Sequence, residues 1–269
     1  GAGKTVLASE LIERFYKKQK IIVLCHRLVL LEQLEEALSV KHNVRKLEVS
    51  DIGPAFEDYD VLLSTNMRAK NVLADAIPKA DLIIVDEAHR LNAKSGMFGN
   101  LGENQVKEII QSCRTSIFFI DEYQRIHLKD VGSEELIRAY AKEMNAEVFD
   151  ADLTSQFRCG GSDGYLAWID NSLGLRPTAN TSLDTSVFDF QIFDDPKEMY
   201  EKIIEKNNQN FKSRLVAGYC WNWISKKDPN ENDIILEGGK LSAKWNLTQH
   251  GMLWIEKDES ISEIGCIHT

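Results

Sequence analysis

Apolar residues follow two patterns in the first half of the chain. Residues 5–18 and 28–38 repeat apolar side chains every three or four positions, which predicts amphipathic helices. Residues 20–26 form a short continuous apolar run with β-branched side chains, which is typical of a buried strand. The two patterns then alternate, and they predict strands over 59–66, 80–89 and 115–123 and helices over 105–113 and 133–144, the last with Ser133 as its N-cap.

This alternation defines the expected fold class. Apolar strands that alternate with amphipathic helices predict an α/β fold, with a parallel sheet and helices on both of its faces. Sheets of this kind bind ligands at the carboxyl ends of their strands. Polar clusters directly follow the predicted strands, so we expect the chemistry of the protein to lie along one edge of the sheet.

The pattern becomes more irregular after residue 160. The polar loop 178–186, TANTSLDTS, is the best candidate for a domain junction. Asp195 and Pro196 open a predicted helix over 195–207, because proline suits the first helical turn. We therefore expect a second α/β unit. The other predicted elements of this half are a helix over 164–175, strands over 187–193, 213–221, 234–238 and 263–269, and a turn-rich loop over 226–233.

Composition narrows the class of protein. The chain has 269 residues, of which 43% are hydrophobic and 28% charged, and this suits one large globular domain or two ordinary ones. Its net charge of −10 disfavours binding of nucleic acid by bulk electrostatics, although a local groove could still bind it. The five cysteines are scattered without metal-ligand spacing, so we expect reduced thiols in a cytoplasmic protein. No apolar run reaches the roughly 18 residues that a membrane span needs.

The chain opens with GAGKT, which matches the last five positions of the phosphate-binding pattern G-x-x-x-x-G-K-[ST]. The backbone N–H groups of Gly1, Ala2, Gly3 and Lys4, with the N-terminus of the next helix, would cradle phosphates. Lys4 would reach the terminal phosphates, and the hydroxyl of Thr5 would be a ligand of Mg²⁺. The first glycine of the pattern and the strand before it would precede residue 1, so we interpret the chain as a fragment of a longer protein.

The run LIIVDEAH supplies the carboxylates that a nucleotide site needs. Hydrolysis of a nucleoside triphosphate requires Mg²⁺ held by a carboxylate, and a group that orients or deprotonates the attacking water. Asp86 suits the first role and Glu87 the second. The alternative is that both carboxylates only cap a strand, but the upstream GKT and the order of the strands favour the nucleotide site. The expected cofactors are therefore ATP and Mg²⁺.

Two further residues suit the same chemistry. Gln124 follows a predicted strand, where a neutral amide can sense a γ-phosphate by hydrogen bonding to it or to the attacking water. Arg158 lies near the end of the first α/β unit, and its guanidinium could stabilise the charge that develops in phosphoryl transfer. Taken singly, each also suits a simpler role, a solvated turn for Gln124 and an ordinary arginine for Arg158.

In their order along the chain, these motifs resemble those of superfamily 1 helicases. GAGKT resembles the end of motif I, VLCHR motif Ia, STN motif Ib, DEAH motif II, IDEYQR motif III, SQFR motif IV and GCIHT the opening of motif V. The set is most similar to the Schlafen group 3-like DNA/RNA helicases. SQFRCGGSDGYLAWID and RLVAGYCWNW are the most specific parts of this resemblance, which covers nearly the whole chain.

The resemblance implies two RecA-like domains of the P-loop NTPase type, with ATP between them and single-stranded DNA or RNA across their top. The first would span 1–160, and the second, incomplete, would span 161–269. Three tryptophans, Trp221, Trp223 and Trp245, would either stack on bases or pack within the fold. The residues on the nucleic-acid side would be His26, Arg27, Ser64, Thr65, Asn66, His268 and Thr269.

Two features depart from the superfamily 1 pattern. DEAH is commoner in superfamily 2, although IDEYQ differs from the Ser-Ala-Thr strand end of that superfamily. The leading glycine of motif I, the rest of motif V and all of motif VI are missing. With half of the phosphate cradle gone, we expect this chain alone to bind nucleotide weakly or not at all, and without motif VI to be weak or inactive as an ATPase.

Two functions are open for the longer protein. The leading one is an ATP-dependent helicase or translocase. The alternative is a nucleotide-gated switch that engages a protein partner without separating strands. Some proteins of the group also carry a nuclease domain, and nothing in this sequence shows one.

Overall fold

The structure is a computed structural model in which the chain forms two compact units, Gly1–Leu183 and Asp184–Thr269. The division falls inside the polar loop 178–186. None of the helices in the described parts of the chain is long and apolar enough to cross a membrane. The structure describes residues 3–47, 60–66, 80–94, 102–124, 130–153, 163–186, 188–246, 254–255 and 257–267.

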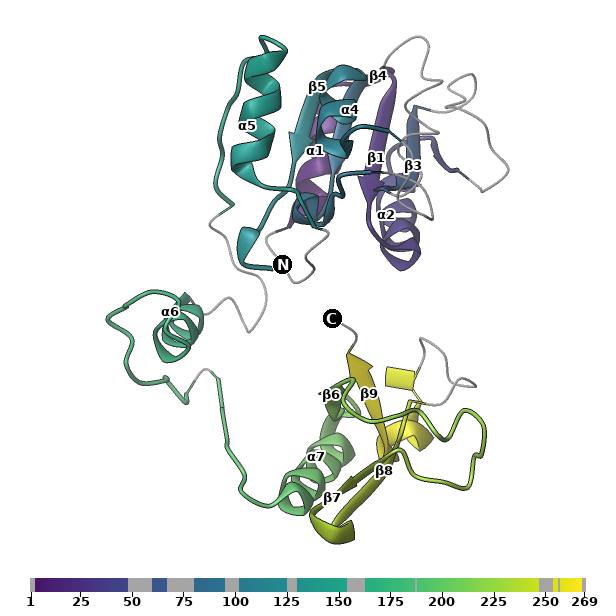
Figure 1. Cartoon of the computed structure of the whole chain (residues 1–269), viewed down its shortest axis with the longest axis vertical. Helices are drawn as coiled ribbons and strands as arrows, with labels where there is room; N and C mark the ends of the chain where they lie inside the picture. Colours follow the sequence, from purple (N-terminus) through teal and green to yellow (C-terminus); the bar gives the residue numbers. More distant parts are fainter. Residues whose placement is uncertain are drawn as a thin grey trace. The chain divides into compact units, whose positions relative to one another are not determined.

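The first unit is built on a five-stranded parallel sheet with the order β2-β3-β1-β4-β5 (Figure 1). Every side chain of β1 and β3 is buried, as expected of parallel strands that are covered on both faces. The parallel α/β class predicted from the sequence is therefore confirmed. The strands are β1 (Ile21–Cys25), β2 (Val44–Lys46), β3 (Val61–Thr65), β4 (Ala80–Val85) and β5 (Cys113–Phe118).

Helices cover both faces of this sheet. Successive side chains of a strand point to opposite faces, so Ile21 and Val23 pack with α1 and α2, while Ile22 and Leu24 pack with α4 and α5. The side chain of Ser133 accepts a hydrogen bond from the backbone N–H of Leu136 at 3.1 Å, which confirms the predicted N-cap of α5. The helices of this unit are α1 (Lys4–Phe15), α2 (Leu28–Ser39), α4 (Gln105–Gln111), α5 (Glu134–Glu143), α6 (Asp163–Ser172) and the 3₁₀ turns η2 (Ala88–Arg90) and η3 (Glu122–Gln124).

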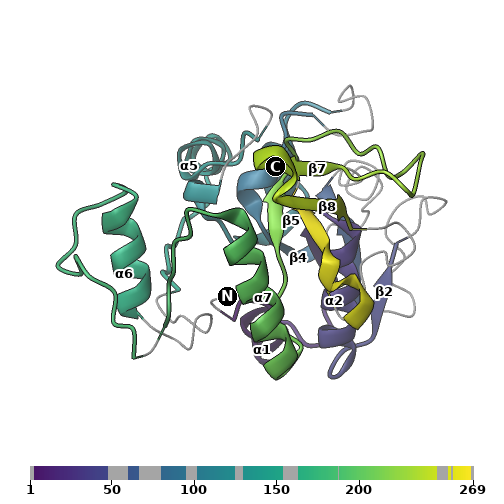
Figure 2. The same ribbon diagram turned by 90° about the horizontal axis from the view of Figure 1, so that it is seen from below.

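The second unit has a smaller sheet with the order β6-β9-β8-β7, in which only the β7–β8 pair is antiparallel. Helix α7 (Pro196–Asn210) contacts β8 of this sheet (Figure 2). Trp245 is fully buried, and Trp221 and Trp223 pack against it, so the structure shows these tryptophans in the core. The strands are β6 (Val216–Gly218), β7 (Ile234–Leu236), β8 (Leu241–Trp245) and β9 (Glu263–Ile267), and the 3₁₀ turns are η5 (Glu237–Gly239) and η7 (Asp258–Ser262).

The structure differs from the sequence prediction at three strands. The strand predicted over 187–193 is wrong for its described part, because 188–193 has no regular structure. An apolar alternation forms a strand only where a neighbouring strand takes up its backbone hydrogen bonds. Strands β2 and β8 were not predicted. β2 has only three residues, whereas the alternating burial of Leu241, Ala243 and Trp245 in β8 follows the period of two that defines a half-buried strand.

Candidate functional site

The carboxyl ends of four strands lie side by side at one edge of the first unit's sheet. Thr65 of β3 pairs with Cys25 of β1, and the backbone N–H of Asp86, just after β4, donates to Leu24 at 2.8 Å. Next to it, the N–H of Phe119, just after β5, donates to Val85 at 2.9 Å. The residues that follow these strands are therefore neighbours, as the sequence predicted for a parallel sheet.

Lys4 meets the carboxylates of Asp86 and Glu87 at this edge. Gly3 precedes α1 in the left-handed conformation, with φ 73° and ψ 25°, and Lys4 is the first residue of the helix. Its Nζ lies 2.8 Å from Asp86 Oδ1 and also donates a hydrogen bond to Glu87 Oε1. Two motifs more than eighty positions apart thus form one ion cluster. Thr5 follows Lys4 on α1 and is half-buried.

Partial burial strengthens this cluster. The side chains of Lys4, Asp86 and Glu87 are 29%, 16% and 20% exposed. Burial alone would lower the pKa of Lys4, but hydrogen bonds and charges from Asp86 and Glu87 outweigh it and raise that pKa. Burial would likewise raise the pKa of Glu87, but its contact with Lys4 outweighs it and lowers the pKa. The ammonium group of Lys4 and the carboxylate of Glu87 are therefore held in their charged forms.

Glu87 has an unusual backbone conformation. Its φ of 54° and ψ of 50° lie in the left-handed region, which costs a residue other than glycine about 1–3 kcal/mol. Because of this conformation, the chain leaves the direction of β4 after Asp86 and enters the turn η2. The N–H of Glu87 donates to Asp86 Oδ1 at 3.0 Å, which stabilises this turn locally. Such strain persists only where the surrounding structure enforces it.

His89 lies behind Glu87 and is 1% exposed. Its Nδ1 accepts a hydrogen bond from the backbone N–H of Asp121 at 3.3 Å. Burial lowers the pKa of His89, so the ring is neutral, and its single proton is on Nε2. Nε2 lies 3.2 Å from Glu87 Oε2, within contact distance although not aligned as a hydrogen bond. Sequence reasoning gave His89 no role beyond its place in DEAH.

Gln124 lies on the neighbouring turn η3. Its side chain is exposed, and its Nε2 donates to Asp121 Oδ2 at 2.8 Å. Because Asp121 also donates its backbone N–H to His89, the turn that carries Gln124 is connected to the carboxylate turn by one residue. Three successive contacts, through Asp121 and His89, thus connect Gln124 to Glu87. Of the other predicted site residues, Gly1, Ala2, Arg158, His268 and Thr269 lie outside the described residues.

The residues predicted to contact nucleic acid follow β1 and β3. His26 is partly buried, and Arg27 is the exposed N-cap residue of α2. Ser64 and Asn66 are 0% and 1% exposed, and neither side chain has a hydrogen-bond partner in the part of the chain that the structure describes. Thr65 is 8% exposed. Within the described residues, Arg27 is thus the member of this group whose side chain clearly reaches the surface.

Gln105 is a buried polar residue that sequence reasoning missed. Its Nε2 donates to the carbonyl oxygen of Asn66 at 2.9 Å, and its Oε1 accepts from the N–H of Asn92 at 2.8 Å. It therefore connects the end of β3 to the segment that follows η2. The signal in the sequence was weak, because a glutamine at the start of a helix is usually exposed.

The donor atoms at this edge suit magnesium. Mg²⁺ prefers oxygen ligands and usually takes one or two from the protein, with the rest from phosphates and water. The hydroxyl of Thr5 and the carboxylate of Asp86 are ligands of this kind. Among the described residues, no group of three or more His, Cys, Asp or Glu side chains gathers as for a protein-enclosed metal ion. The four described cysteines form no disulfide.

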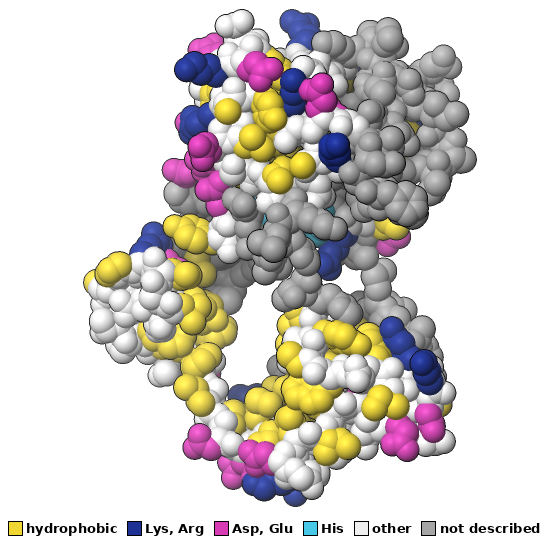
Figure 3. Space-filling view, viewed as in Figure 1, with side chains coloured by type: hydrophobic (Ala, Val, Ile, Leu, Met, Phe, Trp, Pro, Cys, Tyr) yellow, Lys and Arg dark blue, Asp and Glu magenta, His cyan; other side chains and the backbone are white. Residues whose placement is uncertain are grey.

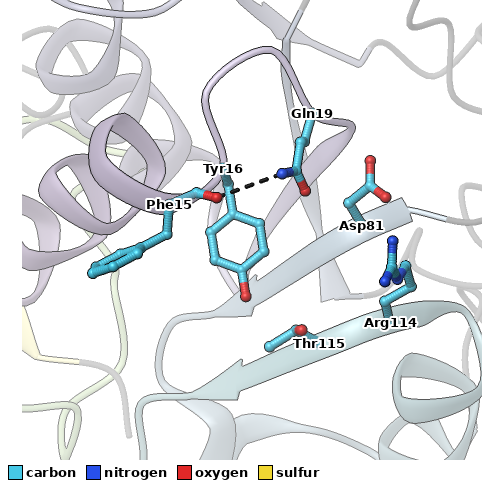
Figure 4. Close-up of a pocket in the computed structure, with 6 residues that line it drawn as sticks. All are labelled: Phe15, Tyr16, Gln19, Asp81, Arg114 and Thr115. Atoms are coloured by element: carbon cyan, nitrogen blue, oxygen red, sulfur yellow. Dashed lines mark hydrogen bonds between the residues drawn. The ribbon is translucent and has the colours of Figure 1, made fainter.

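A separate cavity of about 260 Å³ opens at the opposite edge of the sheet (Figure 4). Asp81 and Arg114 line it from the amino-terminal ends of β4 and β5, and Phe15, Tyr16 and Gln19 line it from the end of α1. It lies far along the strands from Lys4 and Asp86, so it is not part of the ion cluster.

Surface charge on the first unit is mixed. Figure 3 shows acidic and basic side chains interspersed over its visible face. Ion pairs account for much of this, such as Arg138 with Asp150 at 2.7 Å and Lys107 with Glu143 at 3.5 Å. These basic side chains are therefore neutralised locally by the protein.

The fold and this edge define the class of protein, a helicase-like α/β domain. A model of the family described as Schlafen group 3, DNA/RNA helicase domain, matches residues 1–269. The chain therefore belongs to this family, in agreement with the RecA-like α/β fold expected from the sequence.

One curated relative is similar over much of the chain. It is an uncharacterized protein of Saccharomyces cerevisiae, YPL245W, 27% identical over 229 residues. The match covers 77% of this chain and 48% of the relative, so the chain spans about half the length of that protein.

Solved structures show a general likeness. The Sulfolobus solfataricus SWI2/SNF2 ATPase core in complex with dsDNA is 16% identical, with a TM-score of 0.35 over 78% of this chain and 47% of that one. The Pyrococcus furiosus Hef helicase domain is 12% identical, with a TM-score of 0.27 over 45% of this chain and 26% of that one. Likeness at this level says nothing about the site or its ligands.

Proposed function

We propose that the chain is the nucleotide-binding part of an ATP-dependent motor that acts on single-stranded DNA or RNA. The observation that carries the proposal is the convergence of Lys4 on Asp86 and Glu87 at the carboxyl edge of a parallel sheet. Membership of a DNA/RNA helicase family supports it. We further propose that the functional domains are 1–160 and 161–269.

Lys4 would bind the terminal phosphates of ATP. Its ammonium group now pairs with two carboxylates, and phosphate oxygens would replace these carboxylates as its partners when the nucleotide enters. The free N–H groups at the start of α1, with those of Gly1, Ala2 and Gly3, would bind the same phosphates. Thr5 and Asp86 would hold Mg²⁺, which when bound neutralises charge on the phosphate oxygens.

Glu87 would orient and deprotonate the attacking water. Its pKa is lowered, so it is ionised and able to accept a proton or a hydrogen bond at neutral pH. Transfer of Lys4 to the phosphates would release the Glu87 carboxylate for this role. We assign Gln124 to sensing of the γ-phosphate and Arg158 to stabilisation of the transition-state charge.

The strand ends beside the ion cluster would contact nucleic acid. Cys25 and Thr65 lie in register at the same edge as Asp86, so a strand bound over the residues that follow them would be adjacent to the nucleotide. This adjacency would couple hydrolysis to movement along the strand. The residues assigned to this side are His26, Arg27, Ser64, Thr65, Asn66, His268 and Thr269.

ATP hydrolysis by the protein at its full natural length tests the motor function. We expect a higher rate when single-stranded DNA or RNA is added, with double-stranded DNA of the same sequence as the control. Because phosphate contacts are sensitive to salt, the assay should cover several salt concentrations. Hydrolysis at equal rates with and without nucleic acid at every salt concentration would contradict the motor and favour the nucleotide-gated switch.

A further inference from the structure

The turn that carries Glu87 is held from two sides. On the β5 side, the N–H of Ala88 donates to the carbonyl of Phe119 at 2.8 Å, and His89 accepts from Asp121. The other side is formed by residues 130–132, just before α5, which belong to none of the motifs found in the sequence. We call residues 130–132 the α5 clamp.

The α5 clamp binds the end of the turn through both backbone and side chains. The N–H groups of Val131 and Gly132 donate to the carbonyl of Leu91 at 2.8 and 3.3 Å. Asp130 Oδ2 accepts from Arg90 Nη1 at 2.9 Å, and these side chains are 7% and 13% exposed. Since both partners are largely buried, this pair is screened little by solvent. The clamp therefore fixes Arg90 and Leu91 relative to the start of α5.

Gly132 brings the clamp directly against the backbone of the turn. A Cβ atom at this position would lie 1.8 Å from the carbonyl oxygen of Ala88 and 2.8 Å from its carbonyl carbon. Real contacts of this kind do not occur, so any side chain here would force the two backbones apart. The neighbour is main chain, which cannot turn aside as the end of a flexible side chain could.

We propose that Asp130 and Gly132 are positioning residues that set the orientation of the Glu87 carboxylate. Ala88 follows Glu87 directly, and Glu87 is in a left-handed conformation that its surroundings must enforce. A displacement at Ala88 therefore changes the direction of the Glu87 side chain. A shift of about 1 Å in a catalytic group can reduce the rate about 100-fold. The inference rests on the proposed role of Glu87 in hydrolysis.

The clamp also gives α5 a route to the site. Ser133 is the N-cap of α5 and follows Gly132 directly, so a movement of α5 along its axis would displace the clamp. Once Lys4 is on the phosphates of a bound nucleotide, the Glu87 carboxylate would then lose its orientation while the contacts of Lys4 stay the same. A movement of α5 would therefore change the rate of turnover and leave the affinity for nucleotide unchanged.

Gly132→Ala in the full-length protein tests this inference, with Gly218→Ala as the matched control. A Cβ at Gly218 would meet nothing within 4 Å, so that variant adds the same methyl group without a displacement. We expect Gly132→Ala to lower kcat at least about tenfold while KM for ATP changes less than about twofold. Gly218→Ala should retain both constants. A role in folding alone would lower the melting temperature and the active fraction and would leave kcat per active site unchanged.

Asp130→Asn provides a second variant that adds no volume, in case Gly132→Ala does not fold. It removes the charge that pairs with Arg90, and we expect kcat to fall several-fold with KM unchanged. The inference is overturned if Asp130→Asn and any folded Gly132→Ala protein both keep the wild-type kcat.

Glu87→Gln, measured in the same series, distinguishes an error in the clamp from an error in the role of Glu87. If Glu87→Gln turns over normally, the proposed role of Glu87 in activating water is wrong. If it is inactive and the clamp variants are normal, only the clamp is wrong.

Discussion

The two edges of the first unit's sheet contrast in what fills them. At the carboxyl edge, Lys4 binds Asp86 and Glu87, and the cavity lined by Lys4 and Asp86 is only about 10 Å³. At the amino edge, Asp81 and Arg114 line a cavity of about 260 Å³. The contrast shows that an open cavity need not mark the edge where the sequence motifs converge, because side chains of opposite charge can satisfy each other and fill the space between them.

Helix α1 contributes to the difference between the edges. Its N-terminus, at Lys4, lies at the carboxyl edge and carries partial positive charge, whereas its C-terminus, near Phe15 and Tyr16, lies at the amino edge and carries partial negative charge. An anionic ligand such as a nucleotide is therefore favoured at the first edge and disfavoured at the second.

Lys4→Ala should have the largest effect, a loss of nucleotide binding at the carboxyl edge. Removal of the ammonium group leaves Asp86 and Glu87 unneutralised and takes away the side chain that would bind the phosphates. Two charge-assisted contacts of the usual strength correspond to a loss of about 100-fold or more in nucleotide affinity. Calorimetric titration with Mg-ATP measures it. An unchanged affinity would remove Lys4 from the site.

Two substitutions at His89 should have smaller effects and should differ from each other. Gln can replace the Nε2–H donor that faces Glu87, whereas Asn can replace the Nδ1 acceptor of the Asp121 N–H. If His89 orients Glu87, we expect His89→Asn to lower kcat about tenfold and His89→Gln to retain most of it. The reverse order would show that its contact with Asp121 matters more.

The stability of the protein in acid should depend on Glu87. Its pKa is lowered in the folded state from an ordinary value of 4.5, so its contribution to stability is present above that value and is lost as pH falls through the folded pKa. Thermal unfolding between about pH 5.5 and pH 3 should therefore show a steeper loss for the wild type than for Glu87→Gln. Parallel pH profiles would contradict the pairing with Lys4.

Arg114→Ala at the amino edge should have the smallest effect. Arg114 is exposed, and substitutions at such positions usually change stability by about 0.5 kcal/mol or less. We expect kcat and KM for ATP to stay at wild-type values. A marked loss of turnover would mean that the cavity takes part in the reaction after all.

The residues of the ion cluster could be predicted from the sequence, because a parallel sheet brings strand ends together. Lys4, Asp86 and Glu87 are adjacent in the structure for this reason. The residues that hold this cluster and its turn in place could not be predicted. The roles of His89, Gln105 and Gly132 depend on contacts with segments 30 or more positions away or on the path of a single backbone turn.

The predictions of strands succeeded for continuous apolar runs and failed for one alternating run. The apolar runs of β1, β3 and β4 and the Asp195 cap, which accepts from the N–H of Lys197 at 2.8 Å, agree with the sequence prediction. The alternation over 187–193 predicted a strand that is not seen over 188–193. Pairing decides such cases, and a single sequence does not show which edge is free to pair.

The most direct test of the nucleotide site is Glu87→Gln in the full-length protein, with ATP binding and ATP hydrolysis measured on the same sample. Loss of a general base lowers the rate by about 100-fold or more. We expect this loss together with retained binding of Mg-ATP, since Lys4, Thr5 and Asp86 are unchanged. Hydrolysis by Glu87→Gln at the wild-type rate would contradict the assignment of Glu87 to water activation at this site.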